Sequence, residues 1–423
     1  MSINNDTALL SFLDSAHTPY HAVSEMKRIL REAGFTELFE KDSWQLEDGK
    51  GYMVSRYSSS LIAFVYHKDV SGFAIGAAHT DSPTYRVKGE LASGGCMKLD
   101  VEKYGGAIEY SWFDRPLTVA GRAFVRVDGG IEEHNVYIDK DLCVIPSVAP
   151  HMSRQDSFTP NVAVDLSPVI SLGTNKTLLD LVAEAIGTSA DKIVSHDLFL
   201  AQREKGCTFG ANGEFILSRK IDDLASAYAL LTGLVRTASN DGRTVAVFAA
   251  HDHEEVGSMS TGGAWSTFLR DTLTRIAGDR YLECLAQSMI VSADNGHAVH
   301  PNHPEYSDRF SSPTLGNGIL IKNNSSRRYA TDALSEAYFR TVCERVGAPV
   351  QTYFHRADRP CGSTLGTLTL TEVSVPTVDI GLPQLAMHSA FEMIAKVDLD
   401  AMITALSAFY GTEVVLTEKG YAL

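Results

Sequence analysis

Two adjacent glutamates, Glu254 and Glu255, stand in the stretch HDHEEVGS directly after the apolar run VAVFAA. Like charges side by side repel each other, so the end of a strand gains no stability from having both. Carboxylates serve in proteins both as metal ligands and as general bases. The pair therefore suits a site in which one glutamate binds a cation and its neighbour moves a proton, and a solvated charged face is the alternative.

Other histidines and carboxylates also follow directly on apolar runs of strand length. In open α/β sheets the carboxyl ends of the strands meet at one edge, and ligands bind there. Residues at these ends can come together although they lie far apart in sequence. They are His79 and Asp81 after GFAIGAA, Asp294 after SMIVSA, and His388 after VDIGLPQLAM.

A further acidic pair, Asp222 and Asp223, opens the helix-like stretch DDLASAYALL, where a helix N-terminus favours negative charge. With this pair, the chain offers a mixed set of histidine and carboxylate donors, which suits zinc or a related divalent ion. The five candidate metal ligands are His79, Asp222, Glu255, Asp294 and His388.

Five ligands are too many for a single catalytic zinc that keeps a position open for water. They are about right for two metal ions that share one bridging carboxylate. Glu254 is then left to carry a proton, and Asp81 is placed to orient the ligand His79, because a ligand histidine usually donates its other N–H to a carboxylate or carbonyl. The set predicts a two-metal hydrolase.

Each position also has a simpler structural interpretation. Asp222 could be only a helix cap, and Asp294 with the following Asn-Gly reads equally well as a turn. A histidine at a strand end is usually a surface or hydrogen-bonded residue. The prediction depends on the joint pattern, because spacing alone does not separate the chosen ligands from five other histidines in similar surroundings, His251, His253, His297, His300 and His303.

The apolar pattern predicts the elements that must position these residues. Residues 8–34 have helical spacing and end at a glycine, and 72–80 is an apolar run of strand length. After residue 215, apolar strands alternate with amphipathic helices such as 333–347. This alternation is typical of a layered α/β fold.

The stretch from about residue 91 to 215 differs, because it alternates short strands with glycine turns. The whole chain has 423 residues, which is too many for one simple core. We therefore predict a discontinuous α/β catalytic domain, 1–90 and 216–423, with an inserted β-rich domain at 91–215.

Composition excludes several classes of protein. The formal net charge of −15 argues against a nucleic-acid-binding protein, which would normally present a basic face. The sequence contains no run of 18 apolar residues and no secretory signal pattern, so neither a membrane span nor secretion is expected. The six cysteines are scattered without a close pair, which fits a protein of the reducing cytoplasm.

In several stretches of its sequence, the chain resembles the aspartyl aminopeptidase family of metallopeptidases. The similarity extends from about residue 18 to near the end of the chain. It implies a two-zinc catalytic domain that carries an inserted β-rich domain. The matching stretches are AAHTDSPTYRVKG, YGGAIEYSWFDRPLTVAGR, IDDLASAY, DHEEVGS, SADNGHAVHPN, IKNNSSRRYATDALSEA, RPCGSTLG and GLPQLAMHSAFE.

The resemblance also implies a role for each site residue. Asp222 looks like the carboxylate that bridges two Zn²⁺ ions, with Mn²⁺ or Co²⁺ as substitutes. Glu254 would be the general base for a bridging hydroxide that attacks the first peptide bond of a substrate with a free N-terminus. Asp81 would orient a ligand histidine. The remaining ligands would be His79 and Asp294 for one ion, and Glu255 and His388 for the other.

Two substrate-binding residues are implied in the same way. His151, in VAPHMSR, resembles a family histidine that reaches the active site of a neighbouring subunit, and a plain surface histidine is the alternative. Lys322, in GILIKNNSSRRY, resembles the family lysine that meets an acidic substrate side chain, and a solvated strand-end lysine is the alternative. Arg356 and Asp358 match the family region and could line a pocket. The family forms homo-oligomers, commonly tetrahedral dodecamers.

The expected function is therefore release of an N-terminal Asp or Glu from peptides, without a nucleic-acid or membrane partner. Lys322 favours this specificity, because a pocket for neutral residues has no need of that cation. The alternatives are a two-metal aminopeptidase for neutral residues, a related deacylase, and a non-enzymatic assembly protein that keeps the fold. The inserted-domain stretches SFTPNVAVDLSPVISLG and VKGELASGGCMK are only loosely family-like, which affects the expected subunit contacts more than the metal site.

Overall fold

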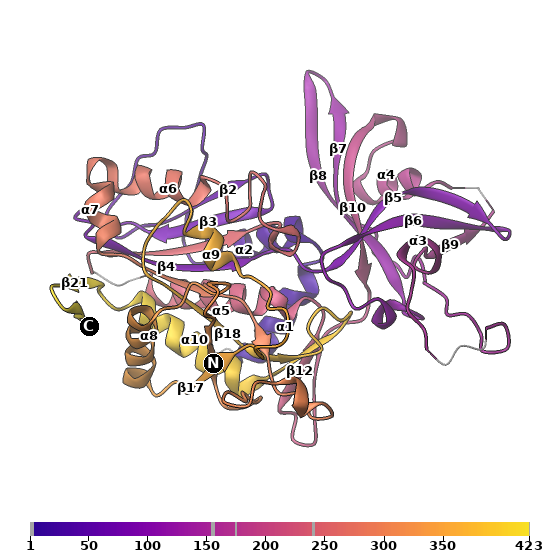
Figure 1. Cartoon of the computed structure of the whole chain (residues 1–423). Coiled ribbons are helices and arrows are strands. Elements are labelled where there is room, and N and C mark those ends of the chain that lie inside the picture. Colours follow the sequence, from indigo (N-terminus) through magenta and orange to yellow (C-terminus); the bar gives the residue numbers. More distant parts are fainter. Residues whose placement is uncertain (1–3, 154–156, 174–175, 239–241, 423) are drawn as a thin grey trace.

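The computed structural model describes residues 4–153, 157–173, 176–238 and 242–422. Figure 1 shows a large part in which helices cover both faces of a sheet, and a smaller β-rich part that projects from one end of it. The mixed α/β architecture predicted from the sequence is confirmed. The residue boundaries given above for the two domains stay a prediction.

A nine-stranded mixed sheet organises the large part. Its four neighbouring strands β13, β4, β14 and β18 run parallel, so their carboxyl ends meet at one edge. The predicted strands that precede the glutamate pair, His79 and Asp294 are three of these four. In spatial order the sheet consists of β1 (Thr36–Leu38), β2 (Gly51–Arg56), β3 (Ser60–Val65), β13 (Thr244–His251), β4 (Gly72–His79), β14 (Met289–Ala293), β18 (Thr377–Gly381), β16 (Ile319–Asn323) and β17 (Val350–Phe354).

Helices cover both faces, and every residue of β4 and β13 is buried between them. Because successive side chains of a strand point to opposite faces, Ala74 and Ala78 of β4 join one core while Phe73 and Ile75 join the other. The first core contains α1 (Asn5–Ser15), α2 (Pro19–Glu32), α5 (Ile221–Thr237), α8 (Ala333–Val346) and α10 (Lys396–Tyr410); the second contains α6 (Phe268–Ala277), α7 (Tyr281–Ala286) and α9 (Leu365–Thr369).

The smaller part is a six-stranded antiparallel sheet with a separate hydrophobic core. The chain enters it after β4 and leaves it before α5, so it is an excursion from the large part (Figure 1). Helix α4 (Leu178–Ile186) packs into this core, and the short α3 (Val162–Asp165) lies against β6. The strand order is β8 (Gly130–Tyr137), β7 (Leu117–Val127), β10 (Ile193–Gln202), β5 (Thr84–Ser93), β6 (Cys96–Tyr104) and β9 (Val169–Leu172).

A third, five-stranded sheet lies beside the edge where the parallel strands end. Its strands β12 (Phe215–Ser218) and β20 (Glu392–Ala395) pair with Ser218 opposite Glu392, which brings the start of α5 close to the segment that carries His388. The other strands are β11 (Cys207–Phe209), β19 (Pro383–Leu385) and β15 (Gly296–His297), and a separate hairpin joins β21 (Val415–Thr417) to β22 (Gly420–Ala422).

The cysteines and the helix lengths relate to two expectations drawn from composition. All six cysteines fall within the described residues, and each is a free thiol. Among the helices in the described part of the chain, none combines the length and the apolar character that a membrane crossing requires.

Candidate metal centre

The predicted donors converge on one pocket of about 490 Å³ at the carboxyl edge of the parallel strands. His79 is the last residue of β4, and Asp294 follows β14. Glu254 and Glu255 form a short 3-10 turn just after β13. These placements follow from the strand ends that the sequence predicts. The remaining two predicted ligands come from other elements, Asp222 from the start of α5 and His388 from the segment between β19 and β20.

Asp222 lies between two groups of donors. Its Oδ1 is 3.6 Å from Nε2 of His79, and its Oδ2 is 3.4 Å from Nε2 of His388, which in turn is 3.4 Å from Oε1 of Glu255. Two donor groups therefore share Asp222: one with His79 and Asp294, the other with Glu255 and His388, and within each group the ligand atoms lie within 4.8 Å of one another. A third group, His79 with both glutamates, overlaps them.

The buried charges of this cluster fit a bound cation. Oδ1 of Asp222 is buried and has no hydrogen-bond partner among the described residues, which is costly unless another group binds it. Burial raises the pKa of Glu255 well above its ordinary value, and burial also raises the pKa of Asp294, with the nearby Asp222 carboxylate adding to both shifts. Divalent metal ions offset such repulsion, and the histidine and carboxylate donors are those that zinc prefers. The residues present therefore fit zinc.

The alternative roles for Asp222 and the glutamate pair are not what the structure shows. Asp222 lies inside α5, where its backbone leaves helical geometry (φ −84°, ψ 110°), and its unpartnered oxygen does not cap the helix. The side chain of Glu255 is only 6% exposed, so the pair is not a solvated face.

Asp81 organises the site more widely than the sequence indicates. Its backbone carbonyl lies 3.0 Å from Nδ1 of His79, and its Oδ1 lies 3.4 Å from the same nitrogen, which suits the expected orienting role. Its carboxylate also accepts hydrogen bonds from the backbone N–H groups of Glu254 (3.0 Å) and Glu255 (3.1 Å) and from the hydroxyl of Tyr104 (2.7 Å). One buried aspartate thus connects the end of β4 to the turn after β13.

Glu392 belongs to the candidate site although the sequence does not indicate it. Its side chain is buried at 2% exposure, and its two oxygens accept hydrogen bonds from two different segments. Oε2 accepts from the backbone N–H of Asp222 (3.0 Å), and Oε1 accepts from that of His388 (2.7 Å). The only sequence signal is a glutamate at the start of the apolar stretch EMIA, and nothing in its spacing indicates two backbone partners.

The connection from the inserted sheet also reaches the metal centre. The carbonyl oxygen of Gly106 lies 3.2 Å from Nδ1 of His388, on the ring nitrogen opposite the one that faces Asp222. A Cβ atom at Gly106 would come within 2.9 Å of that nitrogen, so any larger residue would displace the ring. Gly106, the second glycine of YGGAIEY, therefore allows the backbone to come close to the His388 ring.

Glu254 has the environment expected of a group that exchanges protons near neutral pH. Burial, together with the charges of Asp294, Asp81 and Asp222, raises its pKa to about 8, although His79 acts in the opposite direction. It lines the same pocket as the predicted ligands. A bound cation would lower this pKa, because it favours the charged carboxylate.

The other predicted site residues are placed differently. Lys322 lies on β16 at 2% exposure and lines the pocket, with its Nζ 3.0 Å from the carbonyl of Asn295 and 3.5 Å from Oδ2 of Asp294. His151 is exposed in the loop after β8 and does not line this pocket within one chain. Arg356 and Asp358 pair with each other at 2.7 Å, and Arg356 lines a neighbouring pocket.

The structure also separates the five histidines that spacing could not rank. His297 lines the metal-site pocket, and His300 lines a pocket beside it. His251 is buried at the end of β13, and in the described part of the chain neither of its ring nitrogens has a hydrogen-bond partner. His253 lies 3.0 Å from Oγ of Ser260, and His303 lies 3.1 Å from a carboxylate oxygen of Glu305.

A layered α/β fold with histidine and carboxylate donors at the carboxyl edge of its sheet is typical of metal-dependent hydrolases. Residues 12–410 match the family model described as aminopeptidase I zinc metalloprotease (M18). The chain belongs to this M18 family and is thus a zinc aminopeptidase, a hydrolase.

Individual relatives agree with this assignment. The chain is 39% identical over 421 residues to a probable M18 family aminopeptidase 2 of Pseudomonas aeruginosa strain PAO1, covering 96% of this chain and 97% of the relative. The corresponding protein of Pseudomonas fluorescens strain SBW25 is 37% identical over 420 residues, with the same coverage.

Solved structures show the same fold. The structure of the Ape4 and Nbr1 complex matches with a TM-score of 0.94 at 33% identity, covering 98% of this chain and 88% of that one. An M18 family aminopeptidase from Thermotoga maritima matches with a TM-score of 0.84 at 23% identity, covering 96% of this chain and 95% of that one. The second likeness concerns the fold alone.

Proposed function

We propose that this chain binds two zinc ions and removes acidic residues from the N-termini of peptides. The observation that carries the two-ion proposal is the position of Asp222, whose two oxygens face His79 and His388 from the middle of two donor groups. In this proposal His79 and Asp294 would hold one ion, Glu255 and His388 would hold the other, and Asp222 would contribute to both.

Zinc held there would activate a water molecule and polarise the substrate carbonyl. The chain supplies proton transfer through Glu254, which lines the pocket and carries a pKa raised to about 8 before metal binds. Glu254 accepts a proton from the attacking water and returns it to the departing amine. The carboxylate of Asp81 accepts a hydrogen bond from the backbone N–H of Glu254 at 3.0 Å, and its backbone carbonyl lies 3.0 Å from Nδ1 of His79, so Asp81 fixes the position of the base relative to this ligand.

Zinc content tests the number of ions directly. We expect two zinc ions per chain after dialysis, measured by elemental analysis, and fewer than two in Asp222→Asn, because an amide bridges two cations poorly. Glu283, which lies on α7 away from the pocket, provides the matched control Glu283→Gln. A stoichiometry of one in the wild-type protein would contradict the two-ion proposal.

Preference for an acidic first residue is supported by Lys322, the lysine among the residues that line the pocket. Its Nζ sits over the ring of Tyr329 at 5.1 Å and also pairs with Asp294 at 3.5 Å. Because a metal bound to Asp294 would compete for that carboxylate, Lys322 would be released to pair with a substrate carboxylate. An aminopeptidase for neutral residues is the second candidate. If Lys322 stays paired with Asp294, it does not attract an acidic substrate side chain.

Matched peptides separate these two candidates. The zinc-loaded protein is given peptides that begin with Glu, Asp, Leu or Lys, each with a free or an acetylated N-terminus. We expect rapid release of Glu and Asp from free N-termini only, and we expect Lys322→Met to lose this preference. Faster release of Leu would support the neutral-residue candidate, and cleavage of acetylated substrates would support a deacylase.

We further propose that the protein acts as a homo-oligomer in which His151 enters a neighbouring site. His151 is exposed, and the surrounding loop carries exposed apolar side chains, with Met152 at 83% and Val148 at 58% exposure. Exposed apolar side chains grouped in this way are typical of subunit contacts. One relative of the same fold, mApe1 from yeast, was solved as a dodecamer.

A further inference from the structure

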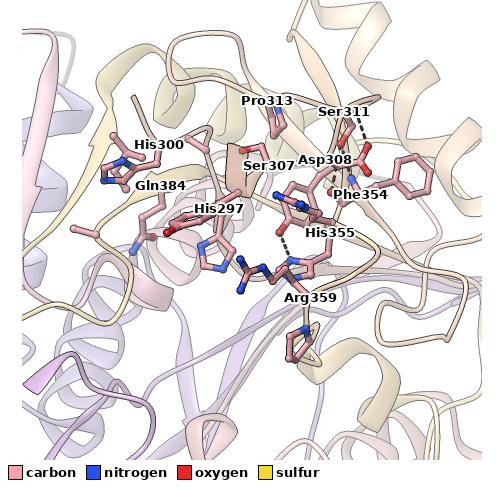
Figure 2. A pocket seen from close by; sticks show the side chains of 17 residues that line it. His297, His300, Ser307, Asp308, Ser311, Pro313, Phe354, His355, Arg359 and Gln384 are labelled. Atoms are coloured by element: carbon pink, nitrogen blue, oxygen red, sulfur yellow. Dashed lines mark hydrogen bonds between the residues drawn. The ribbon is translucent and has the colours of Figure 1, made fainter. Parts of the chain in front are cut away.

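A second pocket, of about 410 Å³, lies beside the metal-site pocket (Figure 2). The two pockets share wall residues, including His297, Tyr353 and His355, so they adjoin each other. None of the proposed metal ligands lines the second pocket, and neither does Lys322. We call it the side pocket. Its walls come from residues 297–313, 353–360 and 384–386.

Arg359 is the cation of the side pocket that forms no close ion pair with a carboxylate among the described residues, although its charge also acts on the adjacent Asp358. Its guanidinium lies 5.4 Å from the ring centre of Tyr306, an arrangement that fixes a planar cation over an aromatic face. Asp358, its acidic neighbour in sequence, pairs instead with Arg356 at 2.7 Å. Arg356 also donates to the carbonyl of Glu305, so part of its hydrogen-bonding capacity is already in use.

The acidic wall residue of the side pocket forms its hydrogen bonds with backbone groups and not with Arg359. Asp308, its acidic wall residue, accepts hydrogen bonds from the backbone N–H groups of Phe310 (2.8 Å) and Ser311 (3.0 Å). Burial lowers the pKa of His297 to about 4 and also lowers the pKa of His355, so both rings are neutral at pH 7. Figure 2 shows Arg359 near His297 and His355, the two histidines that also line the metal-site pocket.

We propose that Arg359 binds a carboxylate carried by the part of the substrate that follows the scissile bond. This inference rests on the proposed aminopeptidase function. The metal-site pocket contains the metal ligands and Lys322, which are the groups needed for the free amine and the first side chain. The adjoining side pocket is left for the rest of the peptide. A guanidinium suits a carboxylate because its planar donors match two oxygens at once.

The carboxylate can come from the side chain of the second residue or from the free C-terminus of a dipeptide. Three substrates with the same first residue distinguish these sources: Glu-Leu-amide, Glu-Glu-amide and Glu-Leu with a free carboxylate. A fourth, Leu-Leu-amide, varies the first residue. Each is assayed with the zinc-loaded wild-type protein, Arg359→Gln and Arg359→Lys. Arg243→Gln is the control, because Arg243 is an exposed arginine that precedes β13 at the end opposite the metal centre.

For Arg359→Gln we expect KM to rise about tenfold for at least one substrate with the additional carboxylate, since a charge-assisted hydrogen bond is lost. The kcat of these substrates and both constants for Glu-Leu-amide should stay unchanged. Arg359→Lys should restore part of the KM. The rise for Glu-Glu-amide identifies the second side chain as the source, and the rise for free Glu-Leu identifies the C-terminus.

Other outcomes overturn the inference. Equal KM changes for all substrates, or no change, would show that Arg359 does not bind a substrate carboxylate. If KM changed for Glu-Leu-amide but not for Leu-Leu-amide, Arg359 would instead bind the side chain of the first residue. Failure of the aminopeptidase proposal is recognised separately, because the wild-type protein would then release nothing from any of the four substrates.

Discussion

At the scale of single residues, the glutamate pair carries the most direct prediction. In Glu254→Gln the side chain keeps its size but cannot accept a proton, so we expect kcat to fall by about 10²–10⁴-fold. Zinc content should remain that of the wild-type protein, since Glu254 is not among the five proposed ligands. Measurement of kcat together with zinc content checks both points. Near-normal turnover would show that another group is the base.

Glu255→Gln is the matched comparison on the neighbouring residue. Its Oε1 lies 3.4 Å from Nε2 of His388, within the donor group that shares Asp222. We expect this variant to lose zinc as well as activity, because an amide is a poorer ligand than a carboxylate. If Glu254→Gln and Glu255→Gln lost zinc equally, the assignment of Glu254 as base and Glu255 as ligand would have no support.

At the scale of secondary-structure elements, Glu392 holds together two segments that come from different sheets and loops. Replacing it by Gln removes one acceptor oxygen and places an N–H group against a backbone N–H of Asp222 or His388. We expect zinc affinity to fall by about 10–100-fold, as for other partners of metal ligands. Competition with a chelator measures this, and excess zinc should restore most of kcat.

The control for Glu392→Gln is Glu413→Gln, a variant of a half-exposed glutamate that pairs at 3.6 Å with the exposed Arg243. An unchanged zinc affinity in Glu392→Gln would show that the two backbone hydrogen bonds do not position the ligands. A loss that excess zinc cannot reverse would indicate a folding defect instead.

At the scale of the whole molecule, the metal-free protein should lose stability as pH rises from 7 to 9. Burial raises the pKa of Glu254 and Glu392 to about 8, and carboxylates that outweigh the effect of burial raise that of His388 to about 10. Since these folded-state pKa values lie above the unfolded ones, the folded protein holds more protons in this range, and removing them favours unfolding. The lowered pKa values of the buried His251 and His297 act below pH 7, whereas Lys220, whose pKa burial lowers well below its ordinary value, opposes part of this loss.

Thermal unfolding with and without a chelator measures this effect. We expect the melting temperature of the chelated protein to fall between pH 7 and pH 9, and that of the zinc-loaded protein to change less, because bound zinc favours the deprotonated ligands. A melting temperature that rises with pH in the chelated protein would contradict the prediction.

Assembly gives a second prediction at this scale. If His151 serves the site of a neighbouring subunit, His151→Ala and Glu254→Gln each inactivate the oligomer, but their mixture contains sites with both groups intact. We therefore expect activity to reappear when the two variants are dissociated, mixed and reassembled. Each variant reassembled alone is the control. A mixture that stays inactive would place His151 outside the neighbouring site.

The strands, the donor types and the family could all be predicted from the amino-acid sequence. The apolar runs that end before His79, Glu254 and Asp294 are β4, β13 and β14, and each is buried throughout its length. Such runs are readable because burial on both faces requires uninterrupted apolar residues. Parallel neighbours bring their carboxyl ends to one edge, so the convergence of these donors follows from the sequence pattern.

The polar groups that support those donors could not be predicted, because they are defined by tertiary packing. Glu392 binds the backbone of Asp222 and His388, two residues far apart in sequence, and backbone N–H groups carry no sequence signal. Gly106 likewise matters because it approaches the ring of His388 closely. Arg359 matters because it lies over an aromatic ring without a close ion pair among the described residues. Contacts of this kind depend on how separate segments pack, and local patterns of residues do not encode that packing.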